Sequence, residues 1–420
     1  MLGPIIAALP PNLHPQPAIL VVLALTYAGI ALGHIPGLKL NRPGIALLGA
    51  ICMMIFGGVS TADIVAYINW PTIFLLFGFF VISAQLRLSG FYGRVAGGIS
   101  ARLGHPARFL FILMVVVAAL SAFLNNDIVC FAFTPIVGLA LLRQRLNPVP
   151  FLIALAIASN IGAAATLVGN SQDMMIGQVA HLGFGQYLLW SILPVTFALA
   201  CAYGIIWMLS QKMIHTQISA TSQNADGPVY PFNPLHTIKG LVILVVVIGL
   251  FFSPLPKEMV ALAAAGIHLA STKFRTEDLL ALVDWPVLIL FMGLFVITGS
   301  FQATGYGDDA AHWLAQVGFN LNAPHTLIFT TAALSNLINN SAAVMLLVKV
   351  IDLSHPTAAY VLALANSFGG SLILIGSVAN IIVVQQARDL GVDIGFRDFA
   401  RLGVPVTLAA LGGLLLWATL

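Results

Sequence analysis

The sequence predicts an all-α polytopic membrane protein made of two inverted-topology repeats, each with five transmembrane helices and one re-entrant hairpin. Composition is the first reason, because 60% of the 420 residues are hydrophobic and only 7% are charged, against about 25% charged in soluble domains. The second reason is a series of apolar segments near the length that a roughly 30 Å hydrocarbon core requires. The third is that the second half repeats motifs of the first.

The apolar segments fall into two sets of six. The first set lies at about 18–36, 43–58, 70–88, 106–142, 150–180 and 187–210, and the second at about 238–254, 257–271, 285–303, 323–353, 358–386 and 399–419. Residues 211–236 between them are rich in Ser, Asn, Gly and Pro, which is typical of an exposed linker. We therefore expect repeat 1 over residues 1–210, a linker over 211–236 and repeat 2 over 237–420.

Four sequence blocks recur in the same order in both halves. Asn69-Trp70-Pro71 returns as Asp284-Trp285-Pro286 and VISAQLRLSG (81–90) as VITGSFQATG (296–305), both 215 residues later. LSAFLNND (120–127) returns as LSNLINNS (334–341) after 214 residues, and Gly162 with Gly169-Asn170 as Gly369 with Gly376-Ser377 after 207. Self-similarity of this kind indicates an internal duplication.

Four segments are interrupted. Those at about 106–142 and 323–353 are too long for one crossing and carry polar tips, Asn125-Asn126-Asp127 and Asn339-Asn340-Ser341, so we interpret them as re-entrant hairpins. Those at about 150–180 and 358–386 carry Gly-rich breaks at 162–170 and 369–377, and irregular backbone at membrane depth is tolerated only where it is buried or lines a cavity. Five crossings per half invert the second half, a pattern typical of secondary transporters.

The positive charges predict the orientation. With both termini on one side, 15 of the 17 Lys and Arg residues fall on the opposite side, leaving only Lys257 and Lys349. The positive-inside rule then makes the linker cytoplasmic and the termini periplasmic or external, in a bacterial inner membrane. So few charges do not form a nucleic-acid footprint, and the three cysteines show no spacing typical of a disulfide framework or a zinc site.

Matching irregular segments in inverted halves indicate a transport site near the midplane. We expect a substrate site lined by the tips and breaks: Asn125, Asn126, Asp127, Cys130, Gly162, Thr166, Asn170, Asn339, Asn340, Ser341, Gly376, Ser377 and Asn380. Amide side chains both donate and accept hydrogen bonds, and so suit a hydroxylated neutral solute or an ion. The alternative is that the Asn residues only satisfy the backbone at the tips.

Asp127 and Asp173 are the candidates for proton coupling, because an ionisable group inside a membrane segment is costly and usually functional. The alternative for Asp127, and for its counterpart Ser341, is an N-cap of the helix that leaves the tip. The alternative for Asp173 is a first-turn residue just past the break. Cys130 lies one turn after Asp127, where it either offers a soft thiol to a metalloid or fills the core.

Two other function classes are disfavoured. Gly305-Tyr306-Gly307-Asp308 matches the GxGD string of intramembrane aspartyl proteases, but a dyad needs a second carboxylate on a facing span and none is evident. We therefore expect no enzyme activity. The sequence has no GxxxxGK[ST] loop, so we expect the proton motive force, rather than ATP or a cofactor, to drive transport.

Three runs carry a resemblance to a known family: FLNNDIVCFAFTPIV, SNIGAAATLVGNSQDMM and GGSLILIGSVANIIVVQQAR. They resemble the ion transporter superfamily, and within it the ArsB-type arsenite and antimonite permeases and related anion transporters. The resemblance implies two inverted repeats, each with a scaffold part and a hairpin-bearing transport part that moves like an elevator, often in a dimer. It leaves open whether an ATPase partner docks on the linker.

The sequence departs from the sodium–dicarboxylate branch of that superfamily. Its tips are Asn-Asn-Asp and Asn-Asn-Ser, at the positions where the resemblance to those symporters implies Ser-Asn-Thr. Residues 169–173 are Gly-Asn-Ser-Gln-Asp, where the resemblance implies Gly-Asn-Pro-x-Asn. The expectation is an exporter of arsenite, and of antimonite, as neutral hydroxides in exchange for protons. The alternatives are a sodium- or proton-coupled carrier of dicarboxylate, sulfate or a similar anion, and a sodium/proton antiporter.

Overall fold

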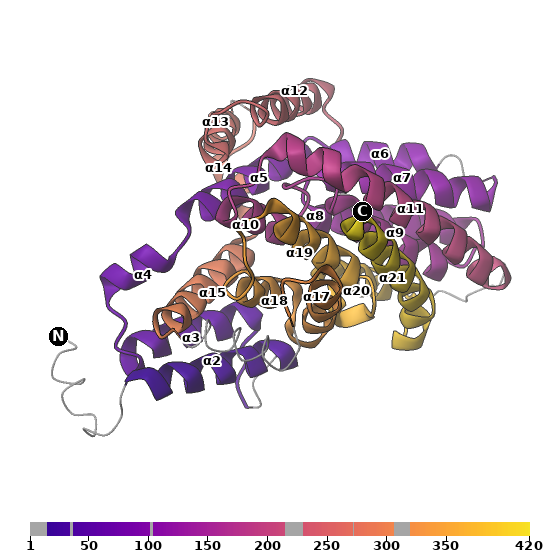
Figure 1. The fold of residues 1–420 in the computed structure, drawn as a ribbon. Helices are drawn as coiled ribbons and strands as arrows, with labels where there is room; N and C mark the ends of the chain where they lie inside the picture. The colour runs from indigo at the N-terminus through magenta and orange to yellow at the C-terminus, as the bar shows by residue number, and fades with distance from the viewer. Residues whose placement is uncertain (1–14, 34–36, 101–103, 215–229, 272, 306–319) are drawn as a thin grey trace.

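The computed structural model describes residues 15–33, 37–100, 104–214, 230–271, 273–305 and 320–420, and over these ranges the chain is helical without strands (Figure 1). The helices of the first half are α2 (Pro15–Leu32), α3 (Arg42–Phe56), α4 (Thr61–Tyr67), α5 (Trp70–Leu88), α6 (Phe91–Ser100), α7 (Pro106–Phe123), α8 (Asn126–Arg143), α9 (Val149–Ala163), α10 (Ser171–Val179) and α11 (Phe184–Ile214). Those of the second half are α12 (Pro234–Leu250), α13 (Lys257–Leu269), α14 (Thr276–Ala281), α15 (Trp285–Ala303), α17 (Pro324–Ile338), α18 (Asn340–Leu347), α19 (Pro356–Gly369), the 3-10 turn η1 (Leu374–Gly376), α20 (Val378–Asp389) and α21 (Phe396–Thr419).

Six of the described helices, α5, α7, α8, α11, α15 and α21, are long and apolar enough to cross a membrane. The prediction of an all-helical polytopic membrane protein is confirmed at this level. The short helices α4, α6 and α14 were not predicted. They lie between the predicted apolar segments, in stretches for which the sequence analysis made no prediction.

The recurring Trp-Pro block produces the same local structure in both halves. Asn69 and Asp284 are the N-caps of α5 and α15, and each accepts a hydrogen bond from the backbone N–H three residues later, at 2.9 and 3.2 Å. The indole N–H groups of Trp70 and Trp285 donate to the carbonyls five residues earlier, at 3.1 and 2.9 Å. Each indole thereby ties a long helix to the short helix before it.

The halves interlock through two equivalent helix pairs. α5 packs on α13, and α15 packs on α3. A Cβ atom on Gly78 would lie 2.7 Å from the Ala261 backbone, and one on Gly293 would lie 2.8 Å from the Ala46 backbone. Only glycine allows such a close helix crossing. Figure 1 shows α12 and α13 at one end of the molecule and α2 and α3 at the other, with the interrupted helices between them.

Both predicted hairpins are interrupted at their polar tips. In the first, α7 and α8 have 18 residues each, about 27 Å at 1.5 Å per residue. In the second, α17 has 15 residues and α18 only eight, so the two hairpins differ in length. Both Gly-rich breaks also interrupt helices, between α9 and α10 and between α19 and α20.

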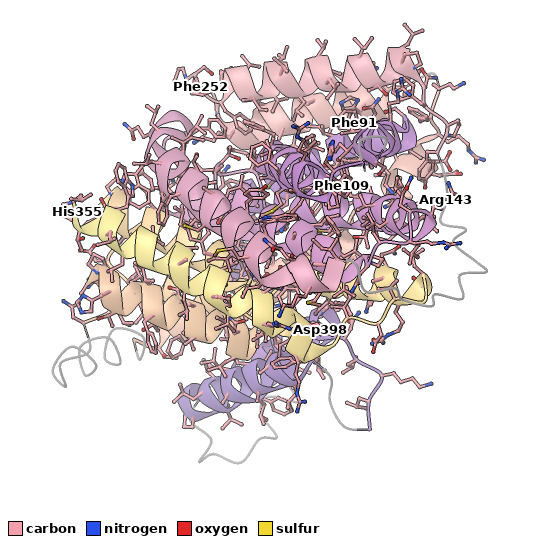
Figure 2. The ribbon with its side chains drawn as sticks, turned by 90° about the vertical axis from the view of Figure 1, so that its right-hand side faces the viewer. Phe91, Phe109, Arg143, Phe252, His355 and Asp398 are labelled. Atoms are coloured by element: carbon pink, nitrogen blue, oxygen red, sulfur yellow. The ribbon has the colours of Figure 1, made fainter. Side chains whose placement is uncertain are left out.

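Figure 2 shows Phe252 and His355 toward one edge of the molecule and Arg143 at the other. The orientation in the membrane, with Arg143 on the cytoplasmic side, stays a prediction. Most of the linker (215–229) and the residues 306–308 of the GxGD string lie outside the described residues.

Candidate functional site

Four helices begin around one small hollow in the middle of the molecule. They are α8 and α18, which leave the two tips, and α10 and α20, which follow the two breaks. Its lining residues are almost all neutral and polar: Asn126, Asp127, Asn160, Asn170, Gln172, Asn340, Ser367, Ser377 and Val378. We call this space the central hollow.

The tips are capped two residues earlier than Asp127 and Ser341, the cap candidates that the sequence offered as an alternative. The Asn125 side chain accepts hydrogen bonds from the N–H groups of Asp127 and Ile128, at 2.9 and 3.3 Å, and so caps α8. Asn339 caps α18 by accepting from the Ser341 N–H at 2.9 Å. The caps are therefore Asn125 and Asn339, whereas Asp127 and Ser341 lie in the first turns and their side chains are available for other contacts.

Asn160, near the end of α9, is the centre of one hydrogen-bond network. Its Oδ1 accepts from Asn126 Nδ2 at 3.3 Å and from Ser377 Oγ at 3.1 Å. Its Nδ2 donates to Asn380 Oδ1 at 3.0 Å and to Ser371 Oγ at 3.4 Å. One amide thus joins the first tip to the break of the second half.

A second network surrounds Asp173, whose side chain is completely buried. Its Oδ2 accepts from Asn170 Nδ2 at 2.7 Å and from Ser367 Oγ at 3.3 Å, and Asn170 Nδ2 also lies 2.9 Å from Ser367 Oγ. Ser367 belongs to α19, so this network also joins the two halves. Asp173 Oδ1 has no hydrogen-bond partner among the described residues.

Asp127 lies differently from Asp173. It is half-buried and lines the central hollow, where the described residues give its carboxylate no hydrogen-bond partner. Across the hollow, Gln172 Nε2 donates to Ser341 Oγ at 2.7 Å and connects the first break to the second tip.

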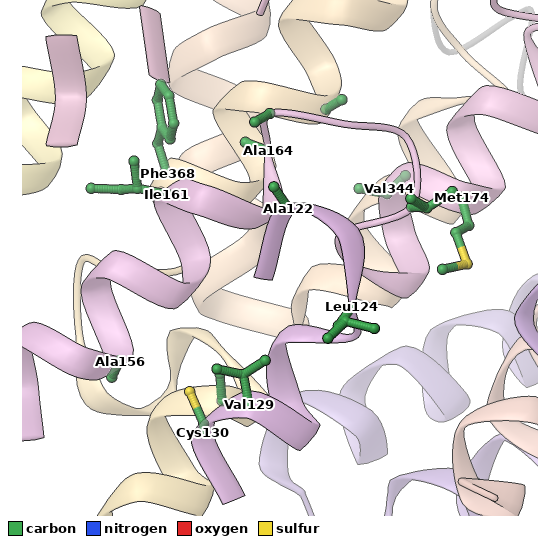
Figure 3. Close-up of a cluster of buried hydrophobic side chains, with 14 of the residues drawn as sticks. Ala122, Leu124, Val129, Cys130, Ala156, Ile161, Ala164, Met174, Val344 and Phe368 are labelled. Atoms are coloured by element: carbon green, nitrogen blue, oxygen red, sulfur yellow. The ribbon is translucent and has the colours of Figure 1, made fainter. Parts of the chain in front are cut away.

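Several predicted residues lie near the hollow without lining it. Cys130 is fully buried in an apolar cluster, and Figure 3 shows it next to Val129. Thr166 donates to the Ala122 carbonyl and so ties the first break to α7. A Cβ on Gly162 would lie 2.3 Å from the Ala118 backbone, and one on Gly376 would lie 2.3 Å from Asn336 Oδ1, so close packing accounts for both glycines.

Four lining residues were missed from the sequence: Asn160, Gln172, Ser367 and Val378. Asn160 and Ser367 are polar residues near the ends of apolar helices, and Gln172 lies within the 169–173 run but was not singled out. A signal was present, however, because the shift of 207 residues that aligns Gly162 with Gly369 also aligns Ser159-Asn160 with Asn366-Ser367.

The hollow has one formal charge and little space. Asp127 is the one charged residue among its lining side chains, and none of those described is basic. The four helix N-termini contribute partial positive charge. The space open to the centre of a water-sized molecule is about 10 Å³, close to the minimum for one water. A solute larger than water therefore requires the surrounding tips and breaks to move.

Comparison with known proteins identifies the family. The model of the citrate transporter family, CitMHS, matches residues 19–365. The chain belongs to the CitMHS family. It is therefore a membrane transporter and not an enzyme, as the sequence predicted. The arsenite branch that the sequence resembles stays a prediction.

Relatives of this CitMHS chain extend over nearly its whole length. A 46 kDa membrane protein of Mycobacterium leprae is 28% identical and covers 94% of this chain and 98% of its own. The silicon efflux transporter LSI3 of Oryza sativa is 28% identical, over 89% and 91%. A Dictyostelium discoideum relative named arsB is 22% identical, over 90% and 86%. The YdaH transporter of Alcanivorax borkumensis has a similar fold, with a TM-score of 0.62, 13% identity and coverage of 97% and 98%.

Proposed function

We propose that this CitMHS protein is a secondary active transporter that exports arsenite, and antimonite, as small neutral hydroxides in exchange for protons. The lining of the central hollow carries the proposal, since it combines amides and hydroxyls with one carboxylate and no described basic side chain. Arsenite at neutral pH is As(OH)3, whose hydroxyl groups both donate and accept hydrogen bonds. A citrate-like anion would instead be repelled by Asp127 in a site of low dielectric constant.

The proposed architecture consists of two inverted repeats, residues 1–210 and 237–420, joined by a cytoplasmic linker in a bacterial inner membrane. The equivalent Trp-Pro helix starts and the exchanged pairs α5–α13 and α15–α3 support a pseudo-twofold relation. The hairpins and broken helices would form the transport part, and its displacement against the other helices would expose the hollow alternately to each side. Matching discontinuous helices are typical of such carriers.

We assign proton coupling to Asp127. It lines the hollow, is half-buried and has no described partner, so it can exchange a proton when the hollow opens. One proton crossing 100 mV supplies about 2.3 kcal/mol, and a tenfold gradient of a neutral solute costs about 1.4, so one proton sustains roughly a 40-fold gradient.

Two relatives are consistent with this substrate class. The rice relative is named for silicon efflux, and silicon in neutral water is the uncharged hydroxide Si(OH)4. The Dictyostelium relative bears the arsB name. An uncharged hydroxide of As or Si presents similar hydrogen-bonding groups to an amide-lined site.

Everted membrane vesicles energised by respiration test the proposal. We expect arsenite uptake above that of membranes lacking the protein, and its abolition by a protonophore. Asp127→Asn should abolish the proton-driven uptake while the protein stays folded. Asp393→Asn is the matched control, because Asp393 is exposed and makes only a 3.7 Å ion pair with Arg388. Undiminished uptake by Asp127→Asn would refute the coupling assignment.

A second candidate is an anion carrier for citrate or a similar carboxylate. It is favoured by the family to which the chain belongs and by the four helix N-termini at the hollow, whose partial charges attract anions. Thermal stabilisation of the purified protein by citrate with sodium, but not by arsenite, would favour this candidate, because a ligand of the folded state raises its stability.

A further inference from the structure

The two hydrogen-bond networks at the central hollow are equivalent under the shift of 207 residues. Asn160 corresponds to Ser367, and Asp173 to Asn380. The bond from Asn160 to Asn380 Oδ1 (3.0 Å) therefore matches the bond from Ser367 to Asp173 Oδ2 (3.3 Å). In the same way, the bond from Ser377 to Asn160 (3.1 Å) matches the bond from Asn170 to Ser367 (2.9 Å).

One difference between the networks concerns the atom that holds each break. In the second half, Asn380 Nδ2 donates to the carbonyls of Gly370 and Ile373, at 2.8 and 3.1 Å, and so holds the break between α19 and α20. The corresponding atom in the first half is Asp173 Oδ1, which is buried and has no partner. The carbonyls that correspond to those of Gly370 and Ile373 are Ala163 and Thr166.

The turn of the first break is also looser. Gly169 N–H donates to the Thr166 carbonyl at 3.5 Å, whereas the equivalent bond from Gly376 N–H to the Ile373 carbonyl is 3.0 Å. The first break thus lacks the donor that an Asn residue supplies in the second. A carboxylate cannot supply it, because an ionised carboxylate only accepts hydrogen bonds, whereas a protonated carboxyl also donates one.

We propose that Asp173 is protonated in this conformation, and that its carboxyl O–H takes the place of the Asn380 amide and holds α10 against the break that follows α9. Loss of the proton leaves an acceptor where the break requires a donor, and so loosens α10 from the carbonyls of Ala163 and Thr166, whereas Asp173 Oδ2 still accepts from Asn170 and Ser367. Asp173 is thus a positioning residue that acts on the site through α10. The proposal rests on the pseudo-twofold relation given under Proposed function, and is independent of the substrate.

The described side chains packed around Asp173 offer an ionised carboxylate no full counter-charge, only the partial positive charge of the α10 N-terminus. α10 packs against α5, α18 and α19. Arg87, in the last turn of α5, is the one titratable residue of that helix, α18 has none and α19 has only Tyr360. From α11, Tyr187 lies against the Tyr360 ring and donates its hydroxyl to the Ala164 carbonyl at 2.9 Å, so its proton is already used. An unpaired buried charge is costly, which favours the neutral acid.

Asp173→Asn tests the proposal, because the amide is neutral, nearly isosteric and carries the missing donor. We expect this variant to fold and to melt no lower than the parent chain. Suppose that an acid is protonated in the folded protein and ionised in the unfolded protein. The folding equilibrium constant then falls about tenfold for each unit by which the pH rises, so this acid favours the folded state most at low pH. The parent should therefore lose stability toward alkaline pH, and Asp173→Asn should lose that part of the slope.

Infrared spectroscopy of the purified protein identifies the group directly. The parent at neutral pH should show a carboxylic-acid C=O band that Asp173→Asn removes and Asp127→Asn retains. The reciprocal variant, Asn380→Asp, should add a second such band and a second loss of stability at alkaline pH. Failure of Asp173→Asn to fold, an unchanged pH slope, or loss of the band only in Asp127→Asn would each overturn the proposal. None of these measurements uses arsenite, so they stand whether or not the proposed substrate does.

Discussion

Replacing Asn160 by alanine tests whether the central network holds the two halves together. The side chain is 3% exposed and makes four hydrogen bonds, to Asn126, Ser377, Asn380 and Ser371. Two of these partners line the hollow, where water can replace the lost amide, whereas Asn380 and Ser371 are buried. The substitution therefore leaves the side chains of Asn380 and Ser371 without the bond to Asn160 and without water to replace it.

The magnitude follows from these four bonds. Interhelical hydrogen bonds in membrane proteins contribute about 0.6 kcal/mol each, so the four together amount to about 2.4 kcal/mol. The buried Asn380 acceptor adds to this loss, since an unsatisfied buried group costs about 1–3 kcal/mol. We expect a total loss of about 3–5 kcal/mol in the free energy of unfolding.

Asn366→Ala is the matched control. Asn366 lies on α19 beside Ser367 and is fully buried, and the described residues give neither its Nδ2 nor its Oδ1 a hydrogen-bond partner. Removing its amide also relieves two unsatisfied polar atoms, so we expect little loss or a small gain in stability. Both variants delete the same atoms from a buried helix position, and only the hydrogen bonds differ.

Unfolding of the purified proteins in detergent or bicelles, followed by tryptophan fluorescence, measures both variants against the parent. Asn160→Ala should unfold earlier and Asn366→Ala should not. Equal losses would mean that packing volume, rather than the network, accounts for the stability at this position. A larger loss in Asn366→Ala would refute the assignment of Asn160 as the centre of the network.

Two further predictions concern backbone geometry. Gly78→Ala places a Cβ 2.7 Å from the Ala261 backbone, so we expect overpacking to lower the free energy of unfolding by about 1–3 kcal/mol. In the control Gly249→Ala the new Cβ has no neighbouring atom within 4 Å, so the higher helix propensity of Ala should raise it by up to about 1 kcal/mol. Melting temperatures of the two variants that shift in the same direction would contradict this. Asn339 has φ +106°, a strained conformation that costs about 1–3 kcal/mol, and replacing an Asn cap by Gly costs only a few tenths. Asn339→Gly should therefore stabilise the folded protein by about 1 kcal/mol. Asn125 has φ −56°, so Asn125→Gly should slightly destabilise it. A higher melting temperature for Asn125→Gly than for Asn339→Gly would be inconsistent with strain at Asn339.

The sequence predicted those features that local chemistry and repetition specify. The apolar segments predicted to begin at about 70 and 285 match the starts of α5 and α15, where an Asn or Asp cap followed by Pro favours a helix start. The Asn-Asn tips and the Gly-rich stretches located the interruptions, because Gly-rich and Asn-rich sequence disfavours a continuous helix. These signals need no knowledge of tertiary contacts.

The partners of each polar side chain could not be predicted in this way. Asn160 and Ser367 bond to residues more than 190 positions away in some cases, as in the bond between Asn170 and Ser367, and no local pattern specifies such a pair. The cap positions at the tips depend on the local backbone, which assigns capping to Asn125 and Asn339 and releases Asp127 and Ser341. Cys130 has suitable spacing for the site, but the helix rotation turns it into the apolar core.

Transport by the purified protein in liposomes with an acidic lumen tests the central claim most directly. Arsenite, silicic acid and citrate would each be offered outside, with liposomes lacking the protein as the control. The account predicts that arsenite enters as protons leave, that a protonophore stops it, and that citrate neither enters nor competes. Citrate entry without arsenite entry would contradict a carrier of neutral hydroxides and would support the anion carrier instead.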